Sequence, residues 1–304
     1  MIVVFLRGGL GNQMFQYAAA RALAKKYGAE VRFDTTFLND RFPRGKVAFY
    51  HFDLDIFGIA PRFTLLSVIS QAAPIPGVWL GIDLALMKAR DAFGIRKIFK
   101  ELSSGEFASS AFDPAMLTAG GNVLLWGYWQ SEKYFEGVKD DIRKEFRFAT
   151  ALTGEAARIA EEIKRTNSVS LHVRRGDYAA IKSVVKIMGE TNLPYYAAAV
   201  AHIGERVKDP HFFIVSNDPA WCRENIKIPF ATTYLDDASA GPKNAYHLEL
   251  MSLCKHNIIA NSTYSWWAAW LNANPEKIVI APKKWFNDPS MSSGDIIPAG
   301  WVAL

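Results

Sequence analysis

Residues 172–178 carry the strongest chemical signal in the sequence. They follow an apolar segment that predicts a buried strand, and they read His172, Val173, Arg174, Arg175, Gly176, Asp177 and Tyr178. Two adjacent arginines offer forked donors to phosphate oxygens, and a glycine lets the backbone approach a ligand closely. The segment therefore predicts a site for a dianionic ligand, with diphosphate as the first candidate. The alternative is that both arginines pair with Asp177 and other surface acids.

A second polar segment, at residues 260–267, also joins an expected strand to an expected helix. Its hydroxyls belong to Ser262, Thr263 and Ser265. Hydroxyls and free amides at a helix N-terminus can bind phosphate through hydrogen bonds and the helix dipole. The same residues would also serve as a plain N-cap, with the following tryptophans packed in the core. The sequence leaves both interpretations open.

Residues 7–13 form a third candidate anion site, directly after the first expected strand. Gly9 and Gly11 match two glycines of the dinucleotide-binding fingerprint, but Met14 stands where the third glycine belongs. Asp34 follows the second expected strand, so a nicotinamide-binding protein stays in view. Residues 53–55 resemble the metal-binding DxD of nucleotide-sugar enzymes, but their apolar neighbours predict the end of a packed strand instead. We expect no metal.

The alternation of apolar and amphipathic segments organises the whole chain. Residues 2–33 predict a strand, a helix that begins at Met14, and a second parallel strand. The same order starts again with a helix at 153–165 and a strand at 168–173. We therefore expect an α/β chain of two doubly wound domains facing a cleft, divided near residue 165. Further strands are expected at 123–125, 211–215, 257–260 and 277–280, and helices at 133–146, 194–207, 219–225, 245–254 and 266–271.

The composition excludes several classes of protein. The chain has 304 residues, 50% of them hydrophobic, and two cysteines, so it is neither disordered nor a disulfide scaffold and suits a reducing compartment. Its net charge of +5 lacks the clustered Lys and Arg of a nucleic-acid footprint but suits anionic small molecules or membranes. The first residues predict a strand instead of a signal peptide, so we expect a cytoplasmic protein.

Residues 63–82 form the longest stretch without a charged residue. Twenty residues are enough to span a bilayer, but Pro74, Pro76 and Gly77 interrupt them. We expect a hairpin-like or interfacial insertion, followed by cations between Lys88 and Lys100. Peripheral contact with an anionic membrane would use this segment. Burial against the N-terminal domain or in a subunit interface is the alternative, and the oligomeric state is not readable.

Four segments together resemble one known family. They read GGLGNQMFQYA at 8–18, GYWQSEKYF at 127–135, the motif at 172–178, and CKHNIIANSTYSWW at 254–267. In them the chain is similar to the bacterial α-1,2-fucosyltransferases of glycosyltransferase family 11. The resemblance implies a GT-B fold of two Rossmann-like domains, GDP-fucose as donor, inversion at the anomeric carbon, and no required metal. It implies an acceptor-side domain at 1–165 and a GDP-sugar-binding domain at 166–304.

The resemblance also assigns residues by position. It places Arg174 at the β-phosphate and Arg175 beside it. Around them it places Asn217 and Asp218 next to the nucleotide, Ser262, Thr263 and Ser265 as a second phosphate clamp, and Asn12 and Gln13 on the opposite side of the cleft. Many relatives have an aspartate about nine residues before their equivalent of His256, where guanine recognition is expected. This chain has His247 there, so Glu249 is expected to contact guanine instead.

The expected reaction sets two chemical requirements. Negative charge grows on the leaving phosphate, and Arg174 with Arg175 can stabilise it. The acceptor hydroxyl must lose a proton, for which Asp177 is the first candidate base and His172 the second, while Asp177 as an orienting partner of the arginines is the alternative. We expect fucose to pass to galactose O2 of an oligosaccharide or lipid-linked glycan. A NAD(P)-dependent oxidoreductase and a non-catalytic carbohydrate-binding protein are the other classes in view.

Overall fold

A computed structural model describes residues 1–42, 49–101, 111–175, 191–288, 291 and 293–304. The chain forms two compact units, the first Met1–Arg147 with Gly294–Ile296 and the second Phe148–Ser293 with Ile297–Leu304. This division precedes helix α6 (Gly154–Arg165), whereas the boundary expected at residue 165 follows it. The reason is that Ile159 and Ile163 of α6 are buried and the helix packs against α11 (Ala245–Leu253) of the second unit.

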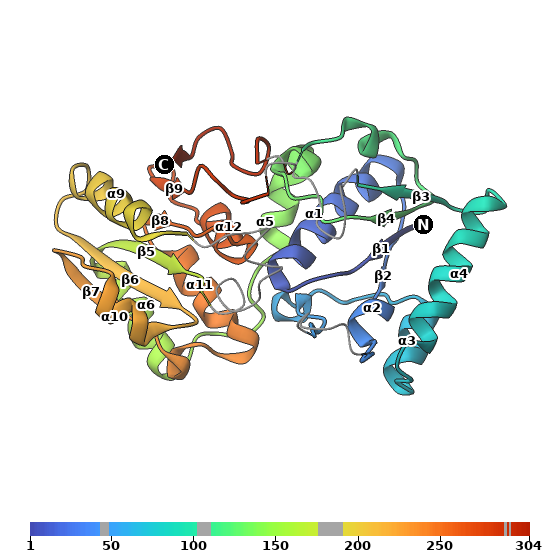
Figure 1. The fold of residues 1–304 in the computed structure, drawn as a ribbon, viewed down its shortest axis with the longest axis horizontal. Helices are drawn as coiled ribbons and strands as arrows, with labels where there is room; N and C mark the ends of the chain where they lie inside the picture. Colours follow the sequence, from blue (N-terminus) through green and yellow to red (C-terminus); the bar gives the residue numbers. More distant parts are fainter. Residues whose placement is uncertain (43–48, 102–110, 176–190, 289–290, 292) are drawn as a thin grey trace. The chain divides into compact units, whose positions relative to one another are not determined.

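The first unit contains a four-stranded parallel sheet in the order β2-β1-β4-β3 (Figure 1). Helix α1 (Leu10–Tyr27) connects the first two strands, and Met87 of α4 (Val78–Ala92) packs on Val3 and Phe5. The strands are β1 (Ile2–Phe5), β2 (Val31–Asp34), β3 (Lys97–Lys100) and β4 (Val123–Trp126). The remaining helices are α2 (Thr36–Asn39), α3 (Leu65–Ala72), α5 (Lys139–Glu145) and the 3-10 helices η1 (Leu54–Phe57), η2 (Pro114–Thr118) and η3 (Glu132–Val138).

The second unit contains a six-stranded parallel sheet in the order β10-β9-β8-β5-β6-β7. On one face Leu171, Ile214 and Ile258 pack against Ala199 of α9 and Cys222 of α10. The strands are β5 (Asn167–Val173), β6 (Pro210–Ser216), β7 (Ala231–Tyr234), β8 (His256–Ile258), β9 (Val279–Ala281) and β10 (Val302–Ala303). The helices are α6, α9 (Leu193–Gly204), α10 (Pro219–Asn225), η4 (Asp237–Ser239), η5 (Pro242–Asn244), α11 and α12 (Thr263–Leu271).

The two parallel sheets confirm the expected fold class, an α/β chain of GT-B type with two Rossmann-like units. In each unit, consecutive strands are parallel and joined through helices, which is the doubly wound pattern. Strands β1 and β5 lie in the interior of their sheets. All four residues of β1 are apolar and buried, and β5 is buried from Ser168 to Val173. Parallel strands bring their carboxyl ends to one edge, and this edge positions the residues considered below.

Several elements differ from the expected ones. Helix α1 begins at Leu10 and not at Met14, because the loop residues 11–13 already form its first turn behind Gly9. The helix expected at 133–146 is divided into η3 and α5, since Val138, with a φ of −132° and a ψ of 18°, leaves helical backbone angles between them. The expectation that residues 53–55 end a strand was wrong, because they lead into η1. Strand β7 was missed because it is a short edge strand without a buried apolar face.

The charge-free segment 63–82 folds into α3 and the start of α4. The turn between the two helices contains Pro74, Pro76 and Gly77, and Gly77 adopts a positive φ of 76° just before α4. The insertion is therefore a pair of short helices. Across the described ranges of the chain, no helix combines the length and apolar character needed to cross a bilayer.

Candidate active site

Three neighbouring strands of the second sheet bring the predicted polar residues to one edge. Strands β8, β5 and β6 lie side by side and run parallel. Their carboxyl ends lead to the three predicted groups: Arg174 and Arg175 after β5, Asn217 and Asp218 after β6, and Ser262, Thr263 and Ser265 at the start of α12, after β8. The topology thus unites three groups that lie far apart in sequence, at the edge where open α/β sheets bind ligands.

Arg175 is held in place by the loop that follows β6. Its backbone N–H donates to Asn217 Oδ1 at 3.0 Å, and its Nε lies 3.6 Å from Asp218 Oδ2. The guanidinium carbon sits 3.8 Å from the centre of the Trp221 ring, a close cation–π contact. Asp218 also caps α10 by accepting from Trp221 N at 3.1 Å. Arg175 is therefore pre-oriented. Its ion pair with Asp218 confirms one part of the alternative expectation, in which the arginines pair with acidic side chains.

Arg174 lies near two aromatic groups of the same edge, the buried His172 and the partly buried Tyr264. Burial and the positive charge of Arg174 both lower the pKa of His172, to about 3. The same charge opposes the burial that raises the pKa of Tyr264. The hydroxyl of Tyr264 donates to Asn244 O at 2.6 Å, and the rings of His172 and Tyr264 are 5.8 Å apart. Arg174, itself partly exposed, is thus close enough for its charge to act on both rings.

His172 is a buried group that links β5 to α12. Its Nδ1 lies 2.9 Å from Ser265 Oγ, and Ser265 Oγ donates to Ser262 O at 3.3 Å. Burial keeps the ring neutral at all ordinary pH values, which makes it a weak proton acceptor. Its geometry suits positioning of α12 better than removal of a proton from a substrate.

The three hydroxyl residues of α12 have different surroundings. Ser262 occupies the N-cap position of α12, yet its side chain makes no capping hydrogen bond. Ser265 is fully buried and bonded within the protein, so its hydroxyl faces His172. Thr263 is partly exposed at the first turn. Of the predicted phosphate clamp, Thr263 is thus the most exposed residue, Ser262 is buried at the N-cap, and Ser265 is bonded within the protein.

The two residues considered for guanine recognition lie around α11. His247 is buried, and its Nε2 lies 3.0 Å from Ser239 Oγ and 3.1 Å from Asp236 O. Burial lowers the pKa of His247, so the ring is a neutral structural group. Glu249 is half-buried, burial raises its pKa, and its Oε2 has no hydrogen-bond partner among the described residues. Asp177 belongs to residues 176–190, which lie outside the described part of the chain.

The two predicted residues of the first unit belong to the first turn of α1. Gln13 is fully buried: its amide group donates to Gly8 O at 3.0 Å and His51 O at 2.7 Å, and its Oε1 accepts from Asp53 N. Asn12 Oδ1 accepts from Gln130 at 2.9 Å. A side chain at Gly8 would lie 2.4 Å from the Asn12 amide, and Gly8 has a positive φ of 75°. Gln13 therefore fixes the loop, while Asn12 is the more exposed of the pair.

Sequence comparison now decides the family. The model of "Glycosyl transferase family 11" matches residues 1–304, the entire chain. The chain belongs to glycosyl transferase family 11. An alpha-1,2-colitosyltransferase of Escherichia coli is 31% identical over 306 residues, covering 100% of this chain and 99% of that protein. The O-antigen biosynthesis glycosyltransferase WbnK of Escherichia coli is 33% identical over 313 residues, covering 98% and 99%.

More distant similarities extend beyond bacteria. Galactoside alpha-(1,2)-fucosyltransferase 1 of Bos taurus is 28% identical over 286 residues, covering 90% of this chain and 67% of the bovine protein. Among solved structures, NodZ alpha-1,6-fucosyltransferase soaked with GDP-fucose aligns with a TM-score of 0.42 and 15% identity, covering 89% of this chain and 92% of NodZ. POFUT1 in complex with GDP-fucose gives 0.39 and 13%, covering 91% and 95%. Membership of family 11 rests on the sequence match.

A buried carboxylate that the sequence analysis missed lies in the first unit of this family 11 glycosyltransferase. Glu101 follows β3, and its two oxygens accept from Tyr128 N at 2.7 Å and Trp129 N at 3.2 Å. Trp129 is fully buried with a positive φ of 55°, a costly conformation for a residue other than glycine. A side chain at Gly127 would come within 2.5 Å of Glu101 Cβ. Glu101 therefore holds the strained turn of the segment 127–135 that carries the family resemblance.

The described residues of the family 11 chain contain no group of three or more His, Cys, Asp or Glu side chains arranged to hold a metal ion.

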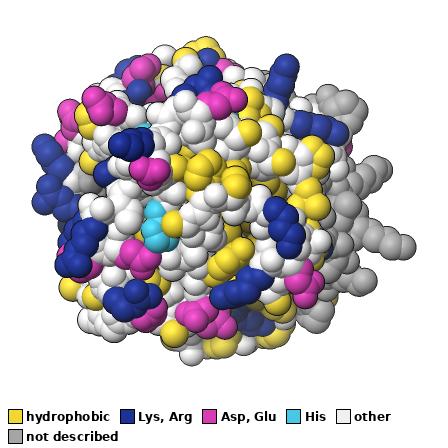
Figure 2. Space-filling view, turned by 90° about the vertical axis from the view of Figure 1, so that its left-hand side faces the viewer, with side chains coloured by type: hydrophobic (Ala, Val, Ile, Leu, Met, Phe, Trp, Pro, Cys, Tyr) yellow, Lys and Arg dark blue, Asp and Glu magenta, His cyan; other side chains and the backbone are white. Residues whose placement is uncertain are grey.

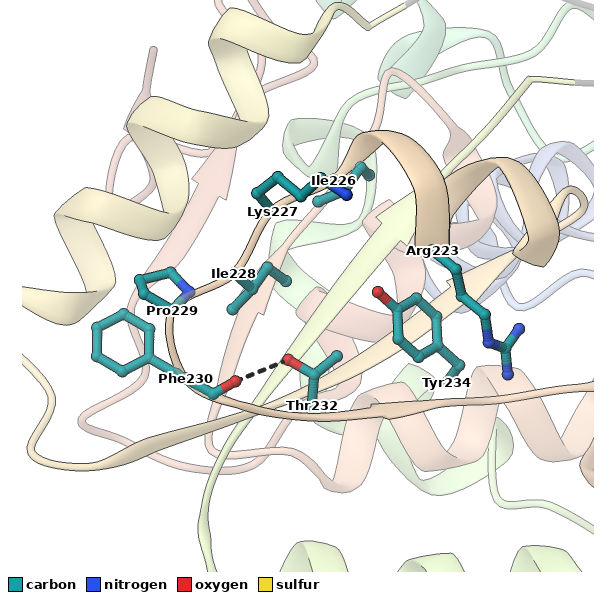
Figure 3. Close-up of a pocket in the computed structure, with 8 residues that line it drawn as sticks. All are labelled: Arg223, Ile226, Lys227, Ile228, Pro229, Phe230, Thr232 and Tyr234. Atoms are coloured by element: carbon teal, nitrogen blue, oxygen red, sulfur yellow. Dashed lines mark hydrogen bonds between the residues drawn. The ribbon is translucent and has the colours of Figure 1, made fainter.

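A surface hollow of about 430 Å³ lies between α10 and the start of β7 (Figure 3). It is lined by Arg223, Ile226, Lys227, Ile228, Pro229, Phe230, Thr232 and Tyr234. None of the residues predicted for the site lines this hollow. Basic and acidic side chains are interspersed on the face seen in Figure 2.

Proposed function

We propose that this family 11 glycosyltransferase moves L-fucose from GDP-fucose, with inversion, to O2 of a galactose residue in an oligosaccharide or lipid-linked glycan. The observation that carries the proposal is the strand edge on which Arg174 and a pre-oriented Arg175 adjoin the open N-terminus of α12. Two cations beside the N-terminus of a helix suit a diphosphate. The fucosyltransferase relatives support fucose as the sugar.

Arg174 and Arg175 have separate tasks in this mechanism. As the bond between fucose and the β-phosphate breaks, the sugar gains oxocarbenium character and negative charge grows on the phosphate. Arg174 meets that charge, and the first turn of α12 adds backbone donors. Arg175, fixed over Trp221, holds the other phosphate in register. Asp218 is an acceptor and suits hydroxyl donors of the nucleoside.

The acceptor hydroxyl needs a base, and the proposal assigns this role to Asp177. His172 is the weaker candidate because its low pKa makes it a poor proton acceptor. The first unit, with Asn12, would bind the acceptor, and the second unit would bind the donor. Glu249 remains the proposed guanine contact, because a carboxylate accepts well from the guanine N–H groups. We further propose that the enzyme works in the cytoplasm.

A second nucleotide sugar is a candidate donor and can be compared directly with GDP-fucose. An end-to-end relative is named as a colitosyltransferase, so the colitose nucleotide sugar is the alternative donor. Thermal shift with GDP, GDP-fucose, the colitose nucleotide, NAD(P) and free glycans tests the proposal. Selective stabilisation by GDP and GDP-fucose is the expected result, because ligands that bind the folded state raise its stability. Stabilisation by NAD(P) alone or by glycan alone would favour an oxidoreductase or a carbohydrate-binding protein and contradict transfer.

Transfer is expected to persist after exhaustive treatment with EDTA. The arginines supply the positive charge that a divalent ion supplies in metal-dependent enzymes. The measurement is release of GDP from GDP-fucose with and without the chelator, and Asp53→Ala serves as a second check, expected to retain turnover. Activity that disappears with EDTA and returns with Mn²⁺ or Mg²⁺ would contradict the proposal and restore Asp53 and Asp55 to the site.

A further inference from the structure

Helix α3 of the first unit is amphipathic in the reverse sense, and α4 exposes aliphatic side chains beside it. A surface helix normally buries its apolar face and exposes its polar one. In α3 the buried residues are Ser67 and Ser70, while Leu65 is 73% exposed and Val68 50%. In α4, Met87 with the partly buried Leu80 and Leu84 packs on the core of the unit, and Asp83 is buried as well. The polar side chains of α3 thus face the protein, and both helices leave large aliphatic side chains exposed.

Hydrogen bonds fix this orientation from the inside. Ser67 Oγ accepts from Thr35 N at 2.8 Å, and Asn39 Nδ2 donates to Ser70 Oγ at 2.9 Å. The hydroxyl of Thr36 lies 2.8 Å from both Asp83 Oδ2 and Asp34 Oδ1. Burial and the neighbouring Asp34 raise the pKa of Asp83 to about 8, so this carboxyl is protonated at neutral pH. The two helices are anchored by specific polar contacts, and the outward apolar face is therefore a stable feature.

The outward face forms a continuous apolar strip. Val78, Ile82 and Leu86 follow one another every four residues on α4, and all three are exposed. At the end of α4 the turn presents Phe93, 80% exposed, and Ile95, 61% exposed. Contiguous exposed apolar side chains of this extent mark an interaction surface. We call the strip of Leu65, Val68, Ile75, Val78, Ile82, Leu86, Phe93 and Ile95 the α3–α4 face.

Charge around the α3–α4 face identifies the partner. Residues 62–100 contain six basic residues and two acidic ones. Of the acids, Asp83 is buried and Asp91 accepts a hydrogen bond from Ile98 N at 2.9 Å. A second copy of the chain docking on this face about a two-fold axis would bring like charges together. An anionic lipid surface instead offers apolar contact and opposite charge at once.

We infer that the α3–α4 face attaches the enzyme peripherally to an anionic bilayer. The aliphatic side chains and Phe93 enter the boundary between headgroups and acyl chains. Lys88, Arg90 and Lys97 reach the headgroup phosphates, because long basic side chains can extend to a polar layer from an apolar position. The contact is reversible and depends on ionic strength. It does not require the proposed fucosyl transfer, and its measurement needs no substrate.

Co-sedimentation of the full-length enzyme with vesicles tests the inference. The enzyme is expected to bind phosphatidylcholine vesicles that contain about a third phosphatidylglycerol at low salt. Its binding to pure phosphatidylcholine vesicles should be at least about tenfold weaker, and about 0.5 M NaCl should release it from the anionic vesicles. The double variant Ile82→Asn with Leu86→Asn removes two apolar side chains of the α3–α4 face. The double variant Lys88→Glu with Lys97→Glu reverses two of the positive charges beside it. Each pair is expected to weaken binding at least about tenfold. Transfer to a soluble oligosaccharide should stay unchanged.

Lys208→Glu with Lys227→Glu is the matched control, since both lysines are exposed in the second unit, far along the chain from this face. This variant is expected to bind anionic vesicles like the wild type. Absence of binding at low salt, or equal losses in the control pair, would overturn the inference. So would a dimer in analytical ultracentrifugation that dissociates with Ile82→Asn, because the face would then be a contact between two copies. Loss of transfer with vesicle binding intact would count against the proposed function alone.

Discussion

Replacing Arg174 by alanine is expected to lower turnover of fucosyl transfer at least about 100-fold, because one preorganised donor to a developing anion is worth that much in comparable active sites. Arg174 lies near buried His172 and partly buried Tyr264, and its charge acts on the pKa of both groups. Arg174→Lys is expected to recover little, since a single ammonium group lacks the forked geometry of the guanidinium. The measurement is kcat for GDP release in the presence of acceptor.

Arg223→Ala provides the control for this prediction. Arg223 lies in the same unit, lines the surface hollow and stacks on Tyr234 with its guanidinium carbon 4.5 Å from the ring. Its loss removes a nearby arginine of similar packing that is not assigned to the diphosphate, and turnover is expected to fall less than about threefold. An Arg174→Ala enzyme that keeps more than a tenth of wild-type turnover would show that this charge does not meet the leaving phosphate.

The sheet edge that carries the candidate site was predictable, because parallel strands end at the same edge of a sheet. Sequence periodicity locates β5 and β6 and the start of α12, and parallel order then brings their carboxyl ends together. Arg174 and Arg175 could be identified from their type and place alone. Trp221 could not, because its role depends on α10 placing the indole under Arg175, a contact between residues far apart in sequence. The same limit applies to Ser265, whose hydroxyl points inward because of His172.

The first unit was harder to read from sequence for a physical reason. Periodicity assumes that apolar faces are buried. Helix α3 reverses this rule by burying Ser67 and Ser70, and α4 buries Asp83 beside its packed apolar residues. Glu101 gave no signal either, since a single glutamate after a strand is ordinarily a solvated charge. Its importance comes from the turn it meets, where Trp129 takes a positive φ. Local sequence does not encode such long-range pairing of a carboxylate with a strained backbone.

Removing this carboxylate is the second large effect that we expect. Glu101→Ala leaves the buried N–H groups of Tyr128 and Trp129 without their acceptor, and the cost is about 2–4 kcal/mol in the free energy of unfolding of the first unit. The turn also contacts α1, since Gln16 donates to Gly127 O at 2.9 Å, so the change should reach the loop of Asn12. Hydrogen–deuterium exchange of peptides covering residues 123–135 measures it, with faster exchange expected than in the wild type.

The same carboxyl predicts a pH dependence whose sign can be checked. Burial raises the pKa of Glu101 to about 7 in the folded chain, above the ordinary value of 4.5, although two backbone donors oppose the shift. The folded state therefore binds the proton more tightly than the unfolded state, and the stabilisation is complete below pH 4.5 and is lost as the pH rises through 7. Protection of residues 127–130, corrected for intrinsic exchange, should fall between pH 5.5 and 8 in the wild type. Glutamine cannot ionise, so in Glu101→Gln the protection of these amides should be lower at pH 5.5 and should change less with pH. An identical fall in both proteins would assign the pH dependence to another group, and buried Asp83 is the first to consider.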